Sequence, residues 1–333
     1  MPRLRPLPDG GLRGHRRQPR RCAVPLGLAG DGRARRLGTL HERLVAPGTL
    51  ARYRHAVRRL LDHWRREEVR IRVLASVDAP LAAYIEELWA EGEPLNLAND
   101  TVSGLQHFLP AVRGHTRQAW RLTKAWARAE PPSRAAPASP QFALAVAGCC
   151  RALGELGAAA MILCGFDAFL RTGELMSIVP EDVVVYSRRQ RAVLRLVHTK
   201  TSVRKNALES VVIRSALAVQ LLEAALQVAV PERPLIGLAP HRFRLLFRSI
   251  LTALDLQGFN YSLYSLRRGG ATWDFLRHGS METTLLRGRW ASTATARIYV
   301  QDAAAEVASL RLSEGQRACM RAAALLLSGD LQS

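Results

Sequence analysis

The segment EPPSRAAPASP, residues 130–140, is the feature that most limits how this chain can fold. Each proline fixes a backbone φ angle and lacks an N–H donor, so four prolines in eleven residues leave no room for a regular helix or strand. We therefore predict an interdomain linker at residues 129–140. In a chain of 333 residues, the sequence on either side is long enough to bury a core of its own.

The sequence before the linker predicts a small helical domain at residues 46–128. In GTLARYRHAVRRLLDHW the apolar residues recur at helical spacing, with arginines on the opposite face. Similar patterns cover PLAAYIEELWAEG and RQAWRLTKAWARA, and TVSGLQHFLPAV predicts a further helix capped by Asn99 or Asp100. We therefore expect a compact four-helix unit with basic residues on its polar faces.

The sequence after the linker predicts a larger domain at residues 141–315, mainly α with one small antiparallel β-sheet. Helical patterns cover residues 141–152 and 155–170, and helices resume from Ser215 to about Leu327. Between them, DVVVYS, AVLRLVHT and ESVVIR are rich in β-branched residues, and the basic turn KTSVRKNAL joins the last two. Residues 316–333 are expected to form a C-terminal helix or tail.

Two further features of the sequence are the composition of the N-terminus and the number of cysteines. Residues 1–45 are rich in Arg, Gly and Pro, show little apolar periodicity and lack the apolar segment of a secretory signal, so we expect a disordered basic arm. The five cysteines are odd in number and show no C-x-x-C spacing. Free thiols are therefore expected rather than disulfides or a zinc site.

The charge of the chain indicates its partner. With 48 Lys and Arg against 28 Asp and Glu, the formal net charge is +20. So many like-charged side chains repel one another unless a polyanion neutralises them. Nucleic acid is the expected partner. An anionic membrane is the competing one, but no stretch approaches twenty uncharged apolar residues, and the apolar run from Ala158 to Leu170 contains Asp167. We expect a soluble protein without a membrane segment.

Two short segments of the second domain contain residues with chemical potential. FLRTGELMSI places Arg171 three residues before Glu174, which alone is an ordinary helical ion pair. VHTKTS contains Lys200, one of only three lysines in an arginine-rich chain. Lysine differs from arginine in giving up its proton when desolvated, as a general acid must. A solvated hairpin lysine is the alternative.

A third segment, from Tyr264 to Val300, adds two arginines and two aromatic residues. YSLRRGGATWDFLRHG predicts a helix that presents Arg267 and Arg268 near its N-terminal end, with a Gly-Gly-Ala stretch that permits close packing. LLRGRWASTATARIYV then places Trp290 at the end of one helix and Tyr299, nine residues later, on the next. Either aromatic alone could be a core residue, and Arg267 alone could be a phosphate clamp.

The joint order of these residues, in a basic two-domain chain, resembles the tyrosine recombinase (phage integrase) family over about residues 46–312. The motif positions of that family fall in this sequence on Arg171 with the following Thr-Gly-Glu-Leu, hairpin Lys200, Arg267 of the His-x-x-Arg box, Trp290 and the nucleophile Tyr299. The segments LRRGGAT and GRWAS are most similar to recombinases of eukaryotic mobile elements.

The resemblance implies a DNA-binding (core-binding) domain at residues 46–128 and a catalytic domain at residues 141–315, together with a mechanism and a set of partners. The enzyme would be a site-specific DNA recombinase or integrase that breaks and rejoins duplex DNA through a covalent 3′-phosphotyrosine, without metal, ATP or other cofactor. Four protomers would assemble on two double-stranded DNA sites, in the nucleus of a eukaryote or the cytoplasm or nucleoid of a bacterium. The implied roles are nucleophile for Tyr299, phosphate binding for Arg171, Arg267 and Trp290, leaving-group protonation for Lys200, and orientation of Arg171 by Glu174.

The sequence departs from the family pattern at Tyr264, which stands where the His-x-x-Arg box has histidine. Tyr264 would donate a hydrogen bond to the phosphate or replace the histidine poorly, and the group that accepts the proton of Tyr299 is then undetermined. Two alternatives stay open: a catalytically inactive, DNA-binding descendant of a mobile-element recombinase, and a helical RNA-binding or scaffold protein with chance motif matches.

Overall fold

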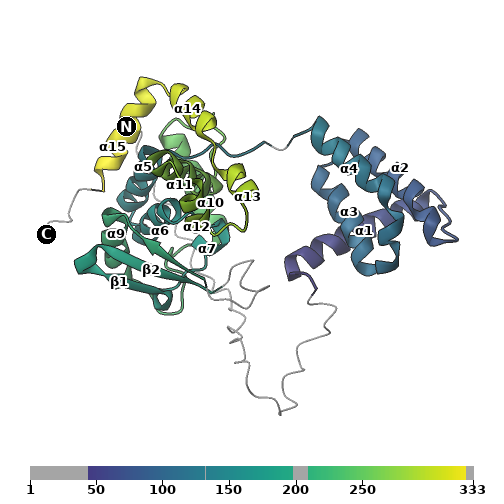
Figure 1. Cartoon of the computed structure of the whole chain (residues 1–333), viewed down its shortest axis with the longest axis horizontal. Coiled ribbons are helices and arrows are strands. Elements are labelled where there is room, and N and C mark those ends of the chain that lie inside the picture. The colour runs from purple at the N-terminus through teal and green to yellow at the C-terminus, as the bar shows by residue number, and fades with distance from the viewer. Residues whose placement is uncertain (1–43, 132, 198–208, 328–333) are drawn as a thin grey trace, which may run out of the picture. The chain divides into compact units, whose positions relative to one another are not determined.

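The computed structural model describes residues 44–131, 133–197 and 209–327. The chain divides between Ser133 and Arg134 into two compact units, called here the N-terminal and the C-terminal unit (Figure 1). The division falls inside the proline-rich segment, between a helix that ends at Ala129 and one that begins at Pro140. The predicted basic arm lies outside the described residues up to position 43, and Lys200 and the whole of the basic turn, residues 200–208, lie outside them as well.

The N-terminal unit is entirely helical in its described part. Its elements are α1 (Pro47–Arg66), η3 (Leu74–Val77), α2 (Asp78–Ala90), α3 (Leu95–Phe108), η4 (Pro110–His115) and α4 (Arg117–Ala129). One face of each α-helix is apolar, and these faces meet in a core that contains Leu60, Leu81, Ile85, Leu88 and Val102, all almost fully buried. The four α-helices predicted from the periodicity are therefore present.

Two aspartates of the N-terminal unit make polar contacts between its helices. The carboxylate of Asp78, the first residue of α2, accepts hydrogen bonds from the backbone N–H groups of Gln118 and Ala119 at 2.8 and 3.0 Å, so it caps the start of α4. The predicted start of α3 at Asn99 or Asp100 is wrong, since the helix begins five or six residues earlier, directly after Pro94. Asp100 instead pairs with Arg52 of α1, at 3.0 Å.

The C-terminal unit combines helices with one small sheet. Its elements are α5 (Pro140–Ala152), α6 (Leu156–Asp167), α7 (Thr172–Leu175), η5 (Pro180–Asp182), β1 (Val183–Tyr186), η6 (Ser187–Arg189), β2 (Arg191–Leu196), β3 (Glu209–Ile213), α9 (Ala216–Gln227), α10 (Pro240–Ala253), α11 (Tyr264–His278), α12 (Met281–Gly288), α13 (Thr293–Tyr299), α14 (Asp302–Leu310) and α15 (Glu314–Leu325). The predicted class, mainly α with a small antiparallel sheet, is confirmed.

The sheet has the order β1-β2-β3, and both pairings are antiparallel. Leu194 at the centre of β2 lies opposite Val183 of β1 and Val211 of β3. Alternate residues of β2 and β3 are buried, as the period of two in a strand requires. All three predicted strands are therefore present, and β2 packs against α9 on the inner face.

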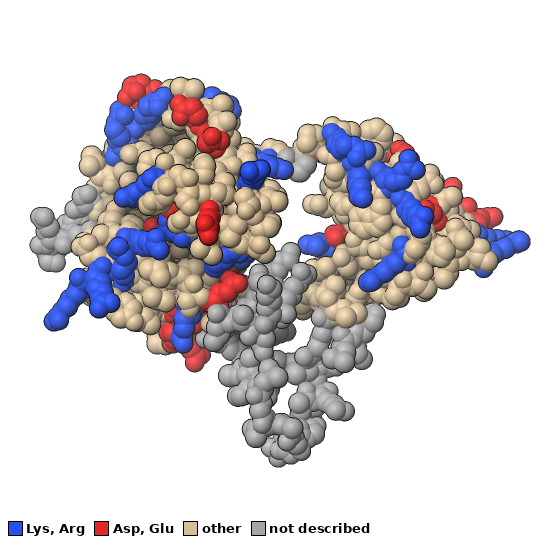
Figure 2. Space-filling view, in the orientation of Figure 1, with Lys and Arg blue, Asp and Glu red and all other residues tan. Residues whose placement is uncertain are grey.

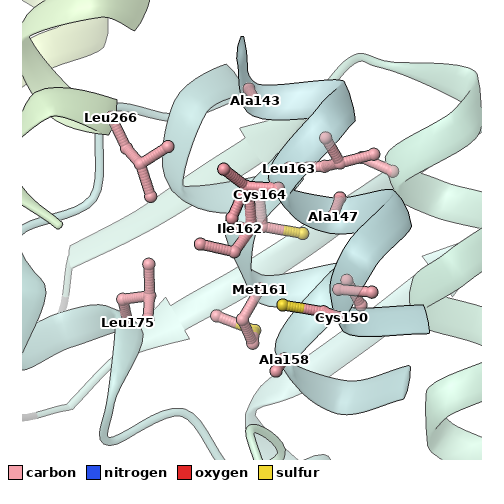
Figure 3. Packing of buried hydrophobic residues seen from close by; sticks show 14 of the residues in the cluster. Ala143, Ala147, Cys150, Ala158, Met161, Ile162, Leu163, Cys164, Leu175 and Leu266 are labelled. Atoms are coloured by element: carbon pink, nitrogen blue, oxygen red, sulfur yellow. The ribbon is translucent and has the colours of Figure 1, made fainter. Parts of the chain in front are cut away.

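The core of the C-terminal unit forms around α5 and α6 (Figure 3). Figure 3 shows the small side chain of Ala147 of α5 close to Leu163 and Cys164 of α6, an arrangement that lets the two helices approach closely. The four cysteines among the described residues have free thiols, as expected. Burial raises the pKa of the Cys149 thiol to about 11, so this thiol is protonated and unreactive at neutral pH.

Two glycines allow helix α11 to pack closely against neighbouring backbone. A Cβ atom at Gly269 would lie 1.9 Å from the carbonyl oxygen of Ala138, and one at Gly270 would lie 2.0 Å from that of Phe166. No other residue fits at either position. The close packing expected from the Gly-Gly-Ala stretch is therefore observed, and it fixes the helix that carries Arg267.

The surface of both units bears many cationic side chains. Figure 2 shows Lys and Arg on the visible face of each unit, with acidic side chains interspersed. Within the described ranges, no helix is both long enough and apolar enough to cross a membrane.

Candidate active site

Arg171 lies at the start of α7, where the chain leaves α6 through a constrained turn. Phe169 adopts a φ of 50°, in the left-handed region that a bulky residue rarely occupies. Glu174 then folds back on the helix start. Its carboxylate accepts 2.8 and 2.7 Å hydrogen bonds from the backbone N–H and the Nη1 of Arg171. The predicted Arg–Glu pair is thus local, and it orients the guanidinium of Arg171, which is 29% exposed.

Arg267 is fully buried, with 0% exposure, and its guanidinium is fixed by backbone carbonyls. Nη1 donates to the carbonyl of Phe169, and Nη2 donates to that of Gly288 at 2.9 Å. Burial, together with the charges of Arg171 and Arg289, lowers the pKa of Arg267 to about 10, so the group remains protonated at neutral pH.

Two neighbouring aromatic rings contact that buried cation. The Cζ of Arg267 lies 4.8 Å from the ring centroid of Trp290 and 5.0 Å from that of Tyr299. The two rings are themselves 4.7 Å apart. Cation–π attraction in a desolvated setting therefore links three of the predicted site residues directly.

Trp290 reaches this position because the chain reverses at the end of α12. Arg289 adopts a φ of 56°, and the N–H of Trp290 returns to the carbonyl of Leu285 at 3.1 Å. The indole then covers Gly288, where a Cβ would lie 1.9 Å from the ring. The indole also stacks on Phe169, with ring centroids 6.3 Å apart. The Nε1 of Trp290 is buried, and the indole helps to lower the pKa of the neighbouring Tyr299.

The last residue of α13 and the first of α11 form a pair of phenols. The hydroxyl of Tyr264 donates a 2.7 Å hydrogen bond to that of Tyr299. Burial raises the pKa of Tyr264 to about 12, and its bond to Tyr299 contributes. Burial also raises the pKa of Tyr299, but the hydrogen bond from Tyr264 and the charge of Arg267 outweigh it, and the pKa lies below its ordinary value.

One site residue was not foreseen from the sequence: Arg289. Its Nη2 lies 2.8 Å from Oε2 of Glu174, and its Nη1 lies 3.4 Å from Oε2 of Glu209, the first residue of β3. Two features could have indicated Arg289: it directly precedes Trp290 in the sequence, and the carboxylate of Glu174 has two oxygens, so it can accept from two guanidiniums. Although burial raises the pKa of Glu174, Arg289 and Arg171 lower it further than that, to below its ordinary value.

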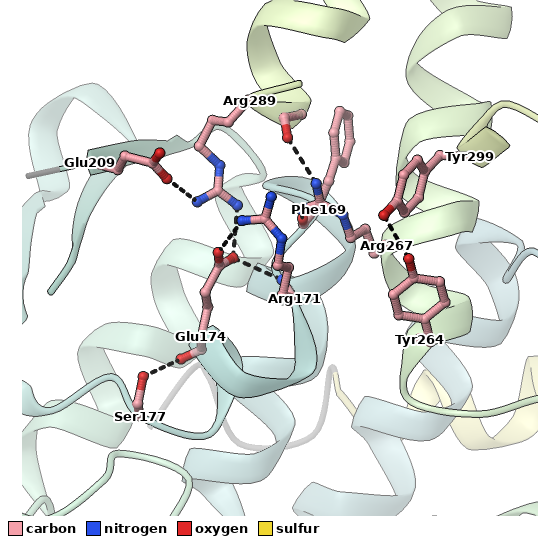
Figure 4. A network of polar contacts seen from close by, with 10 residues as sticks. Phe169, Arg171, Glu174, Ser177, Glu209, Tyr264, Arg267, Arg289 and Tyr299 are labelled. Carbon is pink, nitrogen blue, oxygen red and sulfur yellow. Dashed lines mark hydrogen bonds and ion pairs between the residues drawn. The ribbon is translucent and has the colours of Figure 1, made fainter. Parts of the chain in front are cut away.

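Figure 4 shows how these residues lie together. Arg171, Glu174 and Arg289 lie on one side of Arg267, and the two tyrosines lie on the other. The structure therefore brings together all but one of the residues singled out from the sequence: Arg171, Glu174, Tyr264, Arg267, Trp290 and Tyr299. The remaining one, Lys200, lies outside the described residues.

The surroundings fit an extended anionic ligand. A groove of about 370 Å³ runs beside Tyr264 and Thr172 and is lined by Arg244 and Arg248 of α10. A larger cavity of about 470 Å³ lies elsewhere, between α5, α6 and the second half of α11, and none of the predicted site residues lines it.

No cluster of three or more His, Cys, Asp or Glu that could hold a metal occurs in the ranges described.

This arrangement can bind and attack a phosphodiester. Guanidiniums offer planar sets of donors that match phosphate oxygens, and the indole N–H is a further donor. A phenol whose pKa lies below its ordinary value, at a partly exposed position, is a suitable oxygen nucleophile.

Comparison with known proteins shows the fold. No family model and no curated protein sequence matches the chain. Among solved structures, a lambda integrase dimer bound to a COC′ core site is similar, with a TM-score of 0.54, 16% identity, and coverage of 79% of this chain and 74% of that chain. A second lambda integrase dimer on a COC′ core site gives a TM-score of 0.53 and 15% identity, covering 79% of this chain and 92% of that one.

A structure of XerA recombinase is also similar, with 15% identity and coverage of 82% of this chain and 96% of that chain, at a lower TM-score of 0.42. The two integrase comparisons show that this chain has the fold of tyrosine recombinases. At these identities the likeness concerns the fold alone.

Proposed function

We propose that this chain is a site-specific DNA recombinase or integrase that breaks and rejoins duplex DNA through a covalent bond to Tyr299. The observation that carries this proposal is the Tyr299 phenol, partly exposed and with a lowered pKa, whose ring lies 5.0 Å from the buried guanidinium of Arg267. A core tyrosine would need neither the adjacent cation nor the exposed hydroxyl.

The reaction would proceed by transesterification. The oxygen of Tyr299 attacks a backbone phosphorus, the P–O bond to the 5′-oxygen breaks, and a 3′-phosphotyrosine and a 5′-hydroxyl result. The phenolic proton leaves as the bond forms, and the departing oxygen takes up one proton. Because one phosphodiester replaces another, a 5′-hydroxyl of a second strand can reverse the step and rejoin the DNA without ATP.

The charge that develops on the non-bridging oxygens would be stabilised by Arg171 and Arg267. Arg171 is partly exposed, so its guanidinium has donors for a phosphate, and the buried Arg267 and Trp290 lie beside Tyr299 and help to lower its pKa. Lys200, predicted from the sequence, would protonate the departing 5′-oxygen. These groups supply positive charge and protons from side chains, as the proposed metal-free chemistry requires.

Tyr264 limits the acid–base chemistry. With a pKa of about 12 it is protonated at neutral pH and cannot take the proton of Tyr299. As a donor it would instead stabilise the phenolate of Tyr299 as this forms. The missing acceptor favours a second candidate function, a DNA-binding protein descended from a recombinase that no longer cleaves.

Double-stranded DNA is the proposed partner. The net charge of +20 and the arginine-lined groove beside Tyr264 support it, and both lambda integrase structures are bound to a core site. We also propose a homotetramer on two DNA sites, in the nucleus of a eukaryotic source or the cytoplasm or nucleoid of a bacterial one.

The test begins with the selection of bound duplexes from a random-sequence pool. Selected sites are then nicked close to each possible cleavage position, so that the fragment with the 5′-hydroxyl diffuses away and the covalent product accumulates. We expect labelled DNA that stays attached to the protein on a denaturing gel, and mass spectrometry that places it on Tyr299.

Two variants make the test specific. Tyr299→Phe is expected to abolish the adduct and keep duplex binding, and Tyr186→Phe, which alters an exposed tyrosine of β1, is expected to change neither. Duplex binding without any adduct would favour the binding-only candidate. Preferential binding of single-stranded RNA at moderate salt would contradict both.

A further inference from the structure

Arg289 lies in a cluster of buried charged side chains, where it forms ion pairs with two carboxylates. Its side chain is only 11% exposed, and Glu174 beneath it is 3% exposed. The Glu174 carboxylate uses Oε2 for Arg289, at 2.8 Å, and Oε1 for Arg171, at 2.7 Å. A single carboxylate therefore lies between two guanidiniums, and Figure 4 shows all three side chains close to Arg267.

The charges explain why a second guanidinium is needed there. One carboxylate can neutralise one cation, so with Arg171 alone Glu174 would cancel the charge that a phosphate has to meet. Arg289 supplies the compensating charge on the other carboxylate oxygen, and its Nη1, 3.4 Å from Glu209, ties the pair to β3. With Arg267, three guanidiniums stand against the two carboxylates of Glu174 and Glu209, so the cluster carries one net positive charge, which it would lose without Arg289.

We infer that Arg289 is a positioning residue, which neutralises and holds Glu174 so that Arg171 is both oriented and free to bind the scissile phosphate. This inference rests on the proposed function, and it adds a residue that the sequence motifs do not include. Arg289 acts through Glu174 rather than on the substrate, since both of its Nη groups already contact carboxylates.

The kinetic test compares Arg289→Gln, Glu174→Gln and the double variant in the covalent-adduct assay on full-length protein. Arg289→Gln is expected to slow adduct formation about tenfold or more, and Arg289→Lys to recover part of the loss, because lysine keeps the charge but not the planar fork. The key expectation is non-additivity: in the absence of the Glu174 carboxylate, Arg289→Gln costs nothing further.

The binding test separates positioning from direct contact. Loss of a phosphate contact would lower the slope of log K against log salt by about 0.9. In the Glu174→Gln background, where no carboxylate opposes Arg171, we expect Arg289→Gln to leave that slope and the duplex affinity unchanged, as should Arg321→Gln, which removes one cation from a surface ion pair on α15. A lower slope for Arg289→Gln in that background, or rate losses that multiply in the double variant, would overturn the inference.

An unfolding experiment keeps the inference testable if the chain does not cleave DNA. In a double-variant cycle at neutral pH, Arg289 and Glu174 should be coupled by about tenfold in the unfolding equilibrium constant, because each is buried against the other. A wild-type chain without any adduct contradicts the proposed function, whatever the coupling. A coupling below about twofold contradicts the inference, whether or not the chain cleaves DNA.

Discussion

The hydroxyl of Tyr264 donates a 2.7 Å hydrogen bond to the hydroxyl of Tyr299. The bond has opposite effects on the two phenols: it helps to raise the pKa of the donor, which is already raised by burial, and helps to lower the pKa of the acceptor against its burial. A residue that replaces the histidine of the family pattern thus makes the neighbouring tyrosine easier to ionise, although it cannot itself accept a proton.

Removal of that donor should make Tyr299 less reactive. In Tyr264→Phe the pKa of Tyr299 rises, because the phenolate loses a charge-assisted hydrogen bond, and we expect adduct formation at neutral pH to slow about tenfold. The deficit should shrink as pH rises and Tyr299 ionises without help. A rate–pH profile of both proteins measures this, and a deficit that is constant over the whole range would contradict the explanation.

Restoration of histidine should supply the missing proton acceptor. Tyr264→His places a group with an ordinary pKa of about 6.5 beside Tyr299, and general-base assistance is typically worth a factor of roughly 100 or more. We expect faster adduct formation at neutral pH, together with a new inflection in the rate near that pKa. Slower cleavage without an inflection would show that this position does not take up the proton.

Much of the fold was predictable because it depends on local patterns. The period of the apolar residues identified α1, α2 and α4, and runs of β-branched residues identified all three strands. The start of α3 was not predicted correctly, because Asn99 and Asp100 are good capping residues in isolation, whereas Pro94 determines where the helix begins. Local propensity does not show which of two possible starts the packing selects.

The motif residues of the candidate site were predictable from the sequence. The side-chain positions that depend on an unusual backbone conformation were not. The proximity of Arg267, Trp290 and Tyr299 was expected from the resemblance of their segments to the motifs of tyrosine recombinases, and these side chains do lie together. The contribution of Arg289 depends on a left-handed residue at the end of α12, and the anchoring of Arg267 depends on the carbonyl of Phe169, also left-handed. Neither conformation is favoured by an arginine or a phenylalanine, so the sequence alone does not indicate them.

The position of Trp290 should depend on the absence of a side chain at Gly288. In Gly288→Ala the new Cβ would lie 1.9 to 2.4 Å from three atoms of the indole, so the ring has to move. We expect a loss of about 1–3 kcal/mol in the free energy of unfolding, measured in urea, and a change in tryptophan fluorescence. Gly258→Ala, where nothing lies within 4 Å, is the control. Equal stability of the two variants would contradict the close contact.

The capping of α4 by Asp78 should stabilise the N-terminal unit independently of the site. Asp78→Ala leaves the N–H groups of Gln118 and Ala119 without their acceptor, and we expect a loss of about 1–2 kcal/mol in urea denaturation. Asp62→Ala, which breaks an exposed ion pair with Arg65, should cost less than about 0.5 kcal/mol. Comparable losses for both aspartates would indicate a general charge effect instead of a cap.

The carboxylate of Glu174 should make the stability of the C-terminal unit depend on pH. Its folded-state pKa lies below the ordinary value of about 4.3, so the ionised group stabilises the fold above that pH, and the stabilisation is lost as pH falls through the folded-state pKa. Glu174→Gln cannot ionise. We therefore expect the stability difference between wild type and Glu174→Gln to be largest near pH 7 and to decline steadily below about pH 4, in urea titrations at fixed ionic strength. If the difference instead stays constant down to the acid limit, the carboxylate is not held ionised by Arg289 and Arg171, and the arrangement of charge proposed around Arg171 is wrong.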